Sequence, residues 1–345
     1  MGLFDMRVGI IHILTRIYNG IIRRIHALRH SLRREIKGLY DYDRELFIRY
    51  SGAVNLQAQE AMRARIVMAY HVIEKGLTMP RRRRDFGRPV VLSLIQMLED
   101  WRRTYGCDDE QVRYAGGVVL AYKDMHVEIG EDMADSEFWE RVNRFERNWC
   151  EKNISRQKRY TRESFFKDAG ADFATFAHSR HTCRHFCGVV PMEMLQKAVA
   201  LAMTTPSACN RQHSRVHCIS DHDIRDKIYD IQKGKGNRGF GEDADKLLVV
   251  TADLYDIRWI EERNDIFVNG GMFLMNLSYA LYYYKIAHCI LNWSVTVDAD
   301  KTIHRLLAIP ENERVVAMIA CGNAPNEFYV ANSPRRTWKS IFTIH

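Results

Sequence analysis

Cysteine is scarce in this sequence, and so are long uncharged runs. Eight cysteines among 345 residues are too few for a disulfide scaffold, and most lie in apolar surroundings, as free core thiols do. No signal peptide is recognisable, because the opening segment carries charges throughout and has no small-residue cleavage site. The longest uncharged run, residues 266–284, contains Asn, Gly, Ser and Tyr, which favours a buried helix over a membrane span. Together these features predict a protein of the reducing cytoplasm.

The positive charge of the chain is unevenly distributed. Hydrophobic residues make up 46% of the sequence and charged residues 27%, which is typical of a globular protein, and the length predicts about two domains. The formal net charge is +8. Residues 1–40 hold eight basic and two acidic side chains and therefore supply six of these eight charges. An anionic partner, if one exists, is expected at the N-terminus.

Residues 8–39 have the pattern of a basic amphipathic helix. Apolar side chains recur in steps of three and four, with arginines on the other faces. The apolar stripe consists of Ile10, Leu14, Ile17, Ile21, Ile25, Leu28, Leu32, Ile36 and Leu39. The stripe predicts packing on the protein itself or on a partner subunit. The alternative is a helix that lies on an anionic membrane surface, which would make the protein peripheral at the inner membrane surface.

Residues 41–150 are expected to form a helical region without strands. Four helices are predicted there, at residues 56–73, 90–104, 111–125 and 136–149. Four consecutive arginines follow Pro80, but no aromatics interleave them and no nucleic-acid-binding motif accompanies them, so no nucleic-acid partner is predicted. His71 and Glu74 share one helix face, which resembles half of a di-metal motif. No second such pair is present, and no metal is predicted.

The remainder of the chain predicts a linker at residues 151–171 and an α+β domain at residues 172–345. Apolar runs separated by helical patterns indicate a mixed sheet flanked by helices. The expected strands are residues 216–219, 246–251, 289–295 and 315–320, and the expected helices start at residues 191, 223, 269 and 298.

The stretch from His178 to Cys187 is the most unusual in the sequence. Three histidines and two cysteines within ten residues suggest a metal site, but zinc sites usually need a second ligand pair elsewhere, and none is evident. The residues between them favour another interpretation. Arg180, Thr182 and Arg184 offer two guanidinium groups and a hydroxyl within five residues, which suits an anionic group such as a phosphate.

Three further segments carry groups that can bind a ligand. Residues 206–212 place two amides and a hydroxyl on a turn, where they can hydrogen-bond the polar edge of a heteroaromatic ring. Gly270 and Gly271 are expected to open a buried helix, where they permit close backbone approach and offer unsatisfied N–H groups. Arg335 and Arg336 form a second candidate anion clamp.

In this order and spacing, the four segments resemble the nitroreductase-type flavoprotein family over roughly residues 172–340. Arg180, His181, Thr182 and Arg184 match the segment that binds flavin phosphate and ribityl. Pro206, Ser207, Asn210 and Gln212 match the turn that contacts the flavin ring, usually from the dimer partner. Gly270 and Gly271 fall where the family places a backbone N–H on flavin N5, which makes Gly271 the expected catalytic position. Arg335 or Arg336 falls where a C-terminal basic residue reaches the phosphate.

The resemblance implies an FMN-dependent oxidoreductase. It further implies NAD(P)H as the electron donor, ping-pong hydride transfer to a small organic acceptor, and a homodimer with shared FMN sites. The helical N-terminus and the segments 236–241 and 291–294 resemble a branch associated with bacterial polysaccharide biosynthesis. Phe240, in a Gly-rich loop at residues 234–241, is expected near the flavin face. A non-catalytic flavin-binding or membrane-associated accessory protein is the alternative, and a zinc protein is a second one.

Overall fold

A computed structural model describes residues 2–80, 86–130, 136–232 and 240–345, and within the first helix it leaves out the side chains of residues 2–16, 23, 26 and 27. The chain divides into two compact units. One consists of residues 1–56 with residues 259–261, and the other of residues 57–258 with residues 262–345. The domain boundaries expected at residues 40, 150 and 171 stay predictions.

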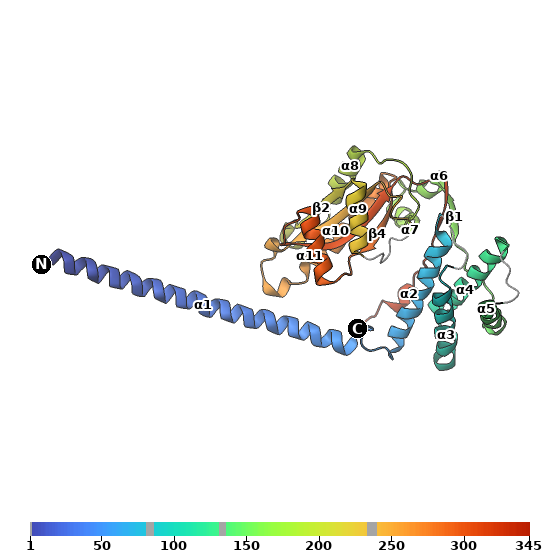
Figure 1. Cartoon of the computed structure of the whole chain (residues 1–345), viewed down its shortest axis with the longest axis horizontal. Coiled ribbons are helices and arrows are strands. Elements are labelled where there is room, and N and C mark those ends of the chain that lie inside the picture. The colour runs from blue at the N-terminus through green and yellow to red at the C-terminus, as the bar shows by residue number, and fades with distance from the viewer. Residues whose placement is uncertain (1, 81–85, 131–135, 233–239) are drawn as a thin grey trace. The chain divides into compact units, whose positions relative to one another are not determined.

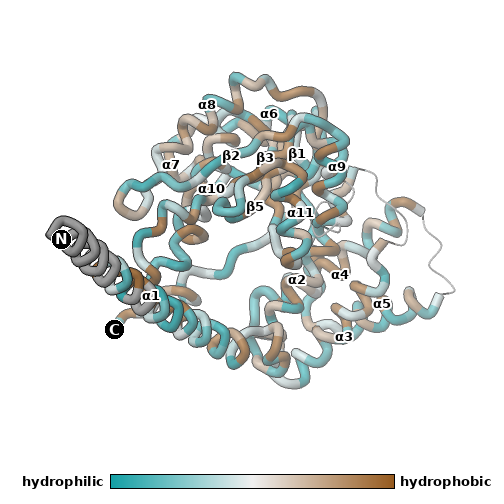
Figure 2. Tube along the Cα trace, turned by 60° about the vertical axis from the view of Figure 1, so that its left-hand side comes forward, coloured by the Kyte–Doolittle hydropathy of each residue, from teal (hydrophilic) through white to brown (hydrophobic). Residues whose placement is uncertain are grey.

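The first unit contains one long helix, α1 (Gly2–Tyr50), which extends beyond the predicted residues 8–39 at both ends. Hydrophobic and hydrophilic residues alternate along the coloured part of this helix (Figure 2). The described stripe residues from Ile17 to Ile36 are exposed; Ile21 is 52% and Leu28 62% accessible. In the described part of the chain, no helix combines the length and the apolar composition that crossing a membrane requires.

The four predicted helices of the helical region are present and form a bundle around their own core (Figure 1). They are α2 (Gln59–Thr78), α3 (Arg88–Tyr105), α4 (Glu110–Glu128) and α5 (Glu137–Asn148). Trp101 and Trp139 belong to the core of this bundle and are each 1% accessible. Burying an aromatic side chain of this size is among the largest single contributions to stability. The bundle is therefore stabilised by a hydrophobic core of its own.

The rest of the second unit consists of a four-stranded sheet, a two-stranded sheet and six helices among the described residues, which confirms the predicted α+β class. The strands are β1 (Lys158–Thr161), β2 (Ser214–Ile219), β3 (Lys246–Asp253), β4 (Ala287–Asn292), β5 (Glu313–Gly322) and β6 (Glu327–Val330). The helices are α6 (Arg162–Phe166), α7 (Phe173–Ser179), α8 (Met192–Ala202), α9 (His222–Ile231), α10 (Asp265–Tyr283) and α11 (Val297–Leu307).

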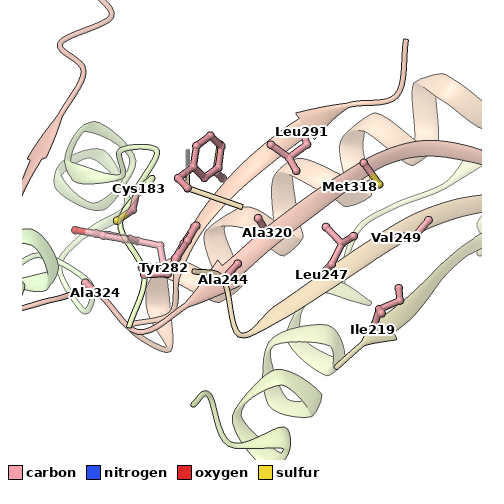
Figure 3. Packing of buried hydrophobic residues seen from close by; sticks show 14 of the residues in the cluster. Cys183, Ile219, Ala244, Leu247, Val249, Tyr282, Leu291, Met318, Ala320 and Ala324 are labelled. Atoms are coloured by element: carbon pink, nitrogen blue, oxygen red, sulfur yellow. The ribbon is translucent and has the colours of Figure 1, made fainter. Parts of the chain in front are cut away.

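The four-stranded sheet has the order β2-β3-β5-β4 and is covered on both faces. A mixed sheet was predicted, but every described strand pair is antiparallel. Leu248 and Val250 face α8 and α10, whereas Leu247 and Val249 point to the opposite core, as the period-2 alternation of a strand requires. Figure 3 shows that second core, in which Met318 and Ala320 of β5 lie among the same side chains.

The predicted linker at residues 151–171 is partly structured. It contains β1, which pairs antiparallel with β6, and the short helix α6. Three of the four residues of β1 are exposed. Its sequence is therefore polar and lacks the apolar pattern that predicts a strand. The pairing brings Lys158 opposite Val330 and so places the chain after β6 beside the start of β1.

Candidate functional site

A cavity of about 960 Å³ in the second unit brings together side chains that are distant in the sequence. Of the predicted site residues, it is lined by Arg180, His181, Thr182, Arg184, Arg335 and Arg336. The two candidate anion clamps, about 150 residues apart in the sequence, therefore face one space. Lys158 of β1 and Met275 and Tyr279 of α10 line the same cavity.

The segment that carries Arg180 and Arg184 is extended, but it is fixed at several points. Tyr282 donates a hydrogen bond to the hydroxyl of Ser179 over 2.9 Å. The amide of Cys183 donates to the carbonyl of His288 at the start of β4 over 3.0 Å, and the Cys183 side chain is fully buried. Because the segment is held to the sheet, the backbone positions of both arginines are fixed. Such preorganisation is what a binding site needs.

Both arginines of this segment carry unmet hydrogen-bonding capacity. The Nε atoms of Arg180 and Arg184 are buried and have no hydrogen-bond partner. Burial lowers the pKa of Arg180, and the positive charge of Arg335 lowers it further. A buried guanidinium without an acidic partner is costly to the fold unless a bound anion compensates it. The residues present thus fit a phosphate-bearing group.

The second clamp lies on the chain that follows β6. Ser333 has a positive φ of 43°, a conformation that is uncommon and costly outside glycine. The guanidinium of Arg335 donates back to the carbonyl of Ser333 over 2.6 Å. This local bond turns the Arg335 side chain toward its own backbone, and the arm with both arginines lines the cavity.

The charge of the cavity has one sign. Lys158, Arg180, Arg184, Arg335 and Arg336 line it, and no carboxylate does among the residues that the structure describes. Charges grouped in a cleft of low dielectric constant raise the local concentration of ligands with the opposite sign. The cavity therefore suits an anionic ligand.

His181 reports on this positive field. Its pKa is lowered to about 4, first by burial and then by the charges of Lys158, Arg180 and Arg335. The folded-state pKa lies below the ordinary value of 6.5, so the unfolded chain takes up a proton before the folded protein does. Stability should therefore fall as the pH drops from about 6.5 to about 4. Buried His288, with a pKa also lowered to about 4, acts in the same direction.

An anion bound in the cavity should raise the pKa of His181, because it offsets the neighbouring positive charges. NMR titration of the imidazole signals, without and with inorganic phosphate, measures this shift. The variant His181→Gln should flatten the fall in stability, and His222→Gln, an exposed position on α9, is the control. A His181 signal that does not move with phosphate would contradict an anion site beside it.

The turn predicted to contact a ring lies outside this cavity. Pro206, Ser207 and Gln212 line a separate hollow of about 20 Å³, and Asn210 is exposed. Asn210 and Gln212 have φ values of 56° and 53°, as does the neighbouring Cys209 with 51°. Non-glycine residues in this conformation persist only where the surroundings hold them, and they cluster at functional sites.

Arg211 holds this strained turn in place. Its guanidinium donates to both carboxylate oxygens of Glu262, over 2.7 and 3.0 Å, and to the carbonyl of Asp256 over 2.8 Å. The hydroxyl of Ser207 accepts a hydrogen bond from the amide of Gln212 over 2.9 Å. The turn is thus a fixed element on the surface of its own chain.

The prediction that Gly270 and Gly271 open a helix is wrong. The helix begins at Asp265, four residues earlier than expected, so both glycines lie within its second turn. Amides at such positions are bonded inside the helix, which removes the free N–H on which the expected role of Gly271 at flavin N5 depended. A side chain at Gly270 would meet Val316 Cγ2 at 2.7 Å, so this glycine permits helix–sheet packing instead.

The environment of Gly271 is different from that of Gly270. Apart from its own stretch of helix, no atom lies within 4 Å of where its Cβ would be. Gly271, Met275 and Tyr279 follow one another at intervals of four and so share one face of α10. The last two line the large cavity.

Residues 177–239 match the model of the nitroreductase family. The matched segment begins at the cavity wall and contains both the arginine segment and the strained turn. The predicted resemblance to this family is confirmed. No curated protein matches the chain.

Several solved structures of similar fold cover about half of the chain. A BluB-like flavoprotein from Clostridium difficile 630 is 18% identical, with a TM-score of 0.44, and the match covers 51% of this chain and 100% of that one. A nitroreductase family protein from the same organism is 18% identical, with a TM-score of 0.40 and coverages of 50% and 97%. A nitroreductase-like protein from Streptococcus mutans is also 18% identical, with a TM-score of 0.42 and coverages of 50% and 98%.

Phe240 was expected near a flavin face, but it is 1% accessible and packs against Phe186 in the core, with ring centroids 6.2 Å apart. Burial of a large aromatic residue explains its position without a ligand. The rest of the Gly-rich loop, up to residue 239, and the arginine run at residues 81–84 lie outside the described residues.

The cavity also has a wall that the sequence did not predict. Val67, Tyr70 and His71 of α2 and Gln111 of α4 line it, although they belong to the helical region and lie far outside the nitroreductase segment. The nearest signal in the sequence was the His71 and Glu74 pair. The two side chains do contact each other, with His71 Nδ1 3.2 Å from Glu74 Oε2.

Proposed function

We propose that the protein is an FMN-dependent oxidoreductase that takes electrons from NAD(P)H and passes them to a small organic acceptor. The observation that carries this proposal is the convergence of the two arginine clamps on one cavity, with buried guanidinium nitrogens that lack a partner. The family match of residues 177–239 supports the redox assignment. FMN, when bound, would supply hydride acceptance and donation.

In this proposal the protein binds and orients the cofactor. Arg180 and Arg184 would hold the phosphate together with Arg335 or Arg336. Each guanidinium group can donate two parallel hydrogen bonds to phosphate oxygens. Thr182 and His181 line the cavity between the two arginines and would hold the ribityl hydroxyls. The open flank of Gly271 would leave room for a flat ring beside α10.

We propose further that two copies of the chain share each site. Ser207, Asn210 and Gln212 lie outside the cavity of their own chain, yet the turn that carries them is strained and firmly held. Two apolar side chains on α10, Phe267 and Met272, are exposed. They lie about one and two turns after Asn264, the residue that precedes the helix. Exposed apolar side chains of this size favour burial against a partner subunit.

Residues 8–39 are proposed to contact a second apolar surface, either a partner subunit or an anionic membrane. The exposed stripe, with arginines beside it, suits both. Removing residues 1–40 should abolish sedimentation with vesicles that contain anionic lipid if the partner is a membrane. Unchanged sedimentation would exclude the membrane, and a change in subunit stoichiometry on removal would identify the partner as a second subunit.

The enzyme is tested by rapid mixing of the FMN-loaded protein with NADH and with NADPH under anaerobic conditions. Loss of the oxidised flavin absorbance, followed by its return when an acceptor is added, is the expected result. A protein that binds FMN but is reduced by neither nucleotide would be the flavin-binding accessory protein. A purified protein that binds no flavin would contradict the proposed function altogether.

A further inference from the structure

Glu74 of α2 is a buried carboxylate that contacts the C-terminal arm with Arg335 directly and the segment with Arg184 through His71. We infer that it is a positioning residue, through which the helical region sets the geometry of the phosphate site. The inference rests on the proposed function. Glu74 is 0% accessible and lies well outside residues 177–239, the part of the chain that the family model matches.

The first contact of Glu74 is with the C-terminal arm. Its Oε1 accepts a hydrogen bond from the amide of Ser333 over 3.1 Å, and its Oε2 lies 3.5 Å from the Ser333 hydroxyl. This is the residue with the strained φ of 43°, which needs such support to persist. The guanidinium of Arg335 donates to the carbonyl of Ser333 over 2.6 Å. The bond between Glu74 and Ser333 therefore also fixes the position of Arg335.

The second contact runs through His71 to the other arm. His71 Nδ1 lies 3.2 Å from Glu74 Oε2, and His71 Nε2 lies 3.4 Å from a terminal nitrogen of Arg184. A guanidinium can only donate. We therefore assign the neutral tautomer in which Nδ1–H donates to Glu74 and Nε2 accepts from Arg184. The carboxylate thus orients the imidazole, and the imidazole orients Arg184.

Two further bonds complete the support from the helical region. The hydroxyl of Tyr114 on α4 donates to Glu74 Oε1 over 2.5 Å, which holds the carboxylate itself. Gln111 accepts from the Tyr70 hydroxyl over 2.6 Å and donates to the carbonyl of Pro334 over 3.4 Å. The C-terminal arm is therefore tied to α2 and α4 at two successive residues. The bundle acts as the frame of the clamp.

The arrangement predicts a loss that is specific to the phosphate. The variant Glu74→Gln keeps the size of the side chain but loses the charge and one of the acceptor oxygens. It should raise the Kd for FMN by about 10-fold, as expected when charge-assisted hydrogen bonds to a positioning group are lost. The Kd for riboflavin, which has the same ring and ribityl chain without the phosphate, should not change.

The experiment measures both constants on the full chain by fluorescence quenching of the flavin. Glu60→Gln, an exposed glutamate at the start of α2, is the matched control and should change neither constant. Should Glu74→Gln fail to fold, Tyr114→Phe removes the hydroxyl that holds the Glu74 carboxylate and changes no backbone group of the C-terminal arm. It should give the same loss for FMN alone.

Equal weakening of FMN and riboflavin would assign Glu74 a purely structural role and overturn the inference. An unchanged Kd for FMN would overturn it as well. Wild-type protein that binds neither flavin would instead contradict the proposed function. The failure of the inference and the failure of the function on which it rests are thereby distinguished.

Discussion

Replacing Arg180 with alanine should raise the Kd for FMN by about 100-fold and leave the Kd for riboflavin nearly unchanged. The Arg180 side chain is half-buried, its Nε is buried without a hydrogen-bond partner, and no carboxylate lines the cavity among the described residues, so a phosphate would be its principal partner. Hydrogen bonds to charged groups contribute about 1.5–3 kcal/mol each, and about 2.7 kcal/mol corresponds to a 100-fold change.

The same variant should not destabilise the protein in the absence of flavin. A partly buried charge without an acidic partner is a cost to the folded state, and its removal takes that cost away. Thermal melting should therefore show an unchanged or higher midpoint for the flavin-free variant, with little of the stabilisation that FMN gives the wild type. Arg305→Ala, an exposed arginine on α11, is the control. An Arg180→Ala protein that binds FMN as tightly as the wild type would refute the assignment.

Mixing two inactive variants should restore about half of the FMN sites in the heterodimers that form. One variant carries Arg180→Ala, and the other carries Asn210→Ala with Gln212→Ala. If each site takes its arginines from one subunit and its turn from the other, a heterodimer has one site with both defects and one intact site. Titration of FMN into proteins that were unfolded together and refolded together measures this recovery.

The turn variant needs a control for backbone effects, because alanine at a positive φ is strained. Cys209→Ala changes a residue with the same conformation in the same turn and should leave FMN binding intact. The turn variant itself should weaken FMN and riboflavin equally, because the turn is predicted to contact the ring. No recovery in the mixture would contradict a shared site.

Much of the fold could be predicted from periodicity. In the helices of the bundle, apolar residues recur at helical spacing. In the four main strands they form short apolar runs, and each pattern is typical of only one kind of element. The short strands β1 and β6 escaped prediction, since four residues are too few to show a pattern and those of β1 are mostly exposed. The start of α10 was placed at the glycines, although Asp265 and Ile266 already belong to the helix.

The arginine clamps could be predicted from residue type, because closely spaced guanidinium groups without neighbouring carboxylates are typical of an anion-binding site. Their convergence is tertiary: the Arg180 segment is bonded to β4, and the arm with Arg335 follows β6, which pairs with β1. A local sequence pattern does not reveal these contacts. The wall formed by Tyr70, His71 and Gln111 depends on tertiary packing between α2, α4 and the C-terminal arm. His71 and Glu74 were noticed as a pair on one helix face, but their partners Arg184 and Ser333 are more than 100 residues away.

The central claim is that arginines from two distant segments hold one phosphate. A double-mutant cycle on FMN affinity tests it most directly, with Arg180→Ala as one change and Arg335→Ala together with Arg336→Ala as the other. The claim predicts that the two effects depart from additivity by more than about 0.5 kcal/mol for FMN and have no counterpart for riboflavin. Additive effects on FMN binding, or equal effects on both flavins, would contradict it.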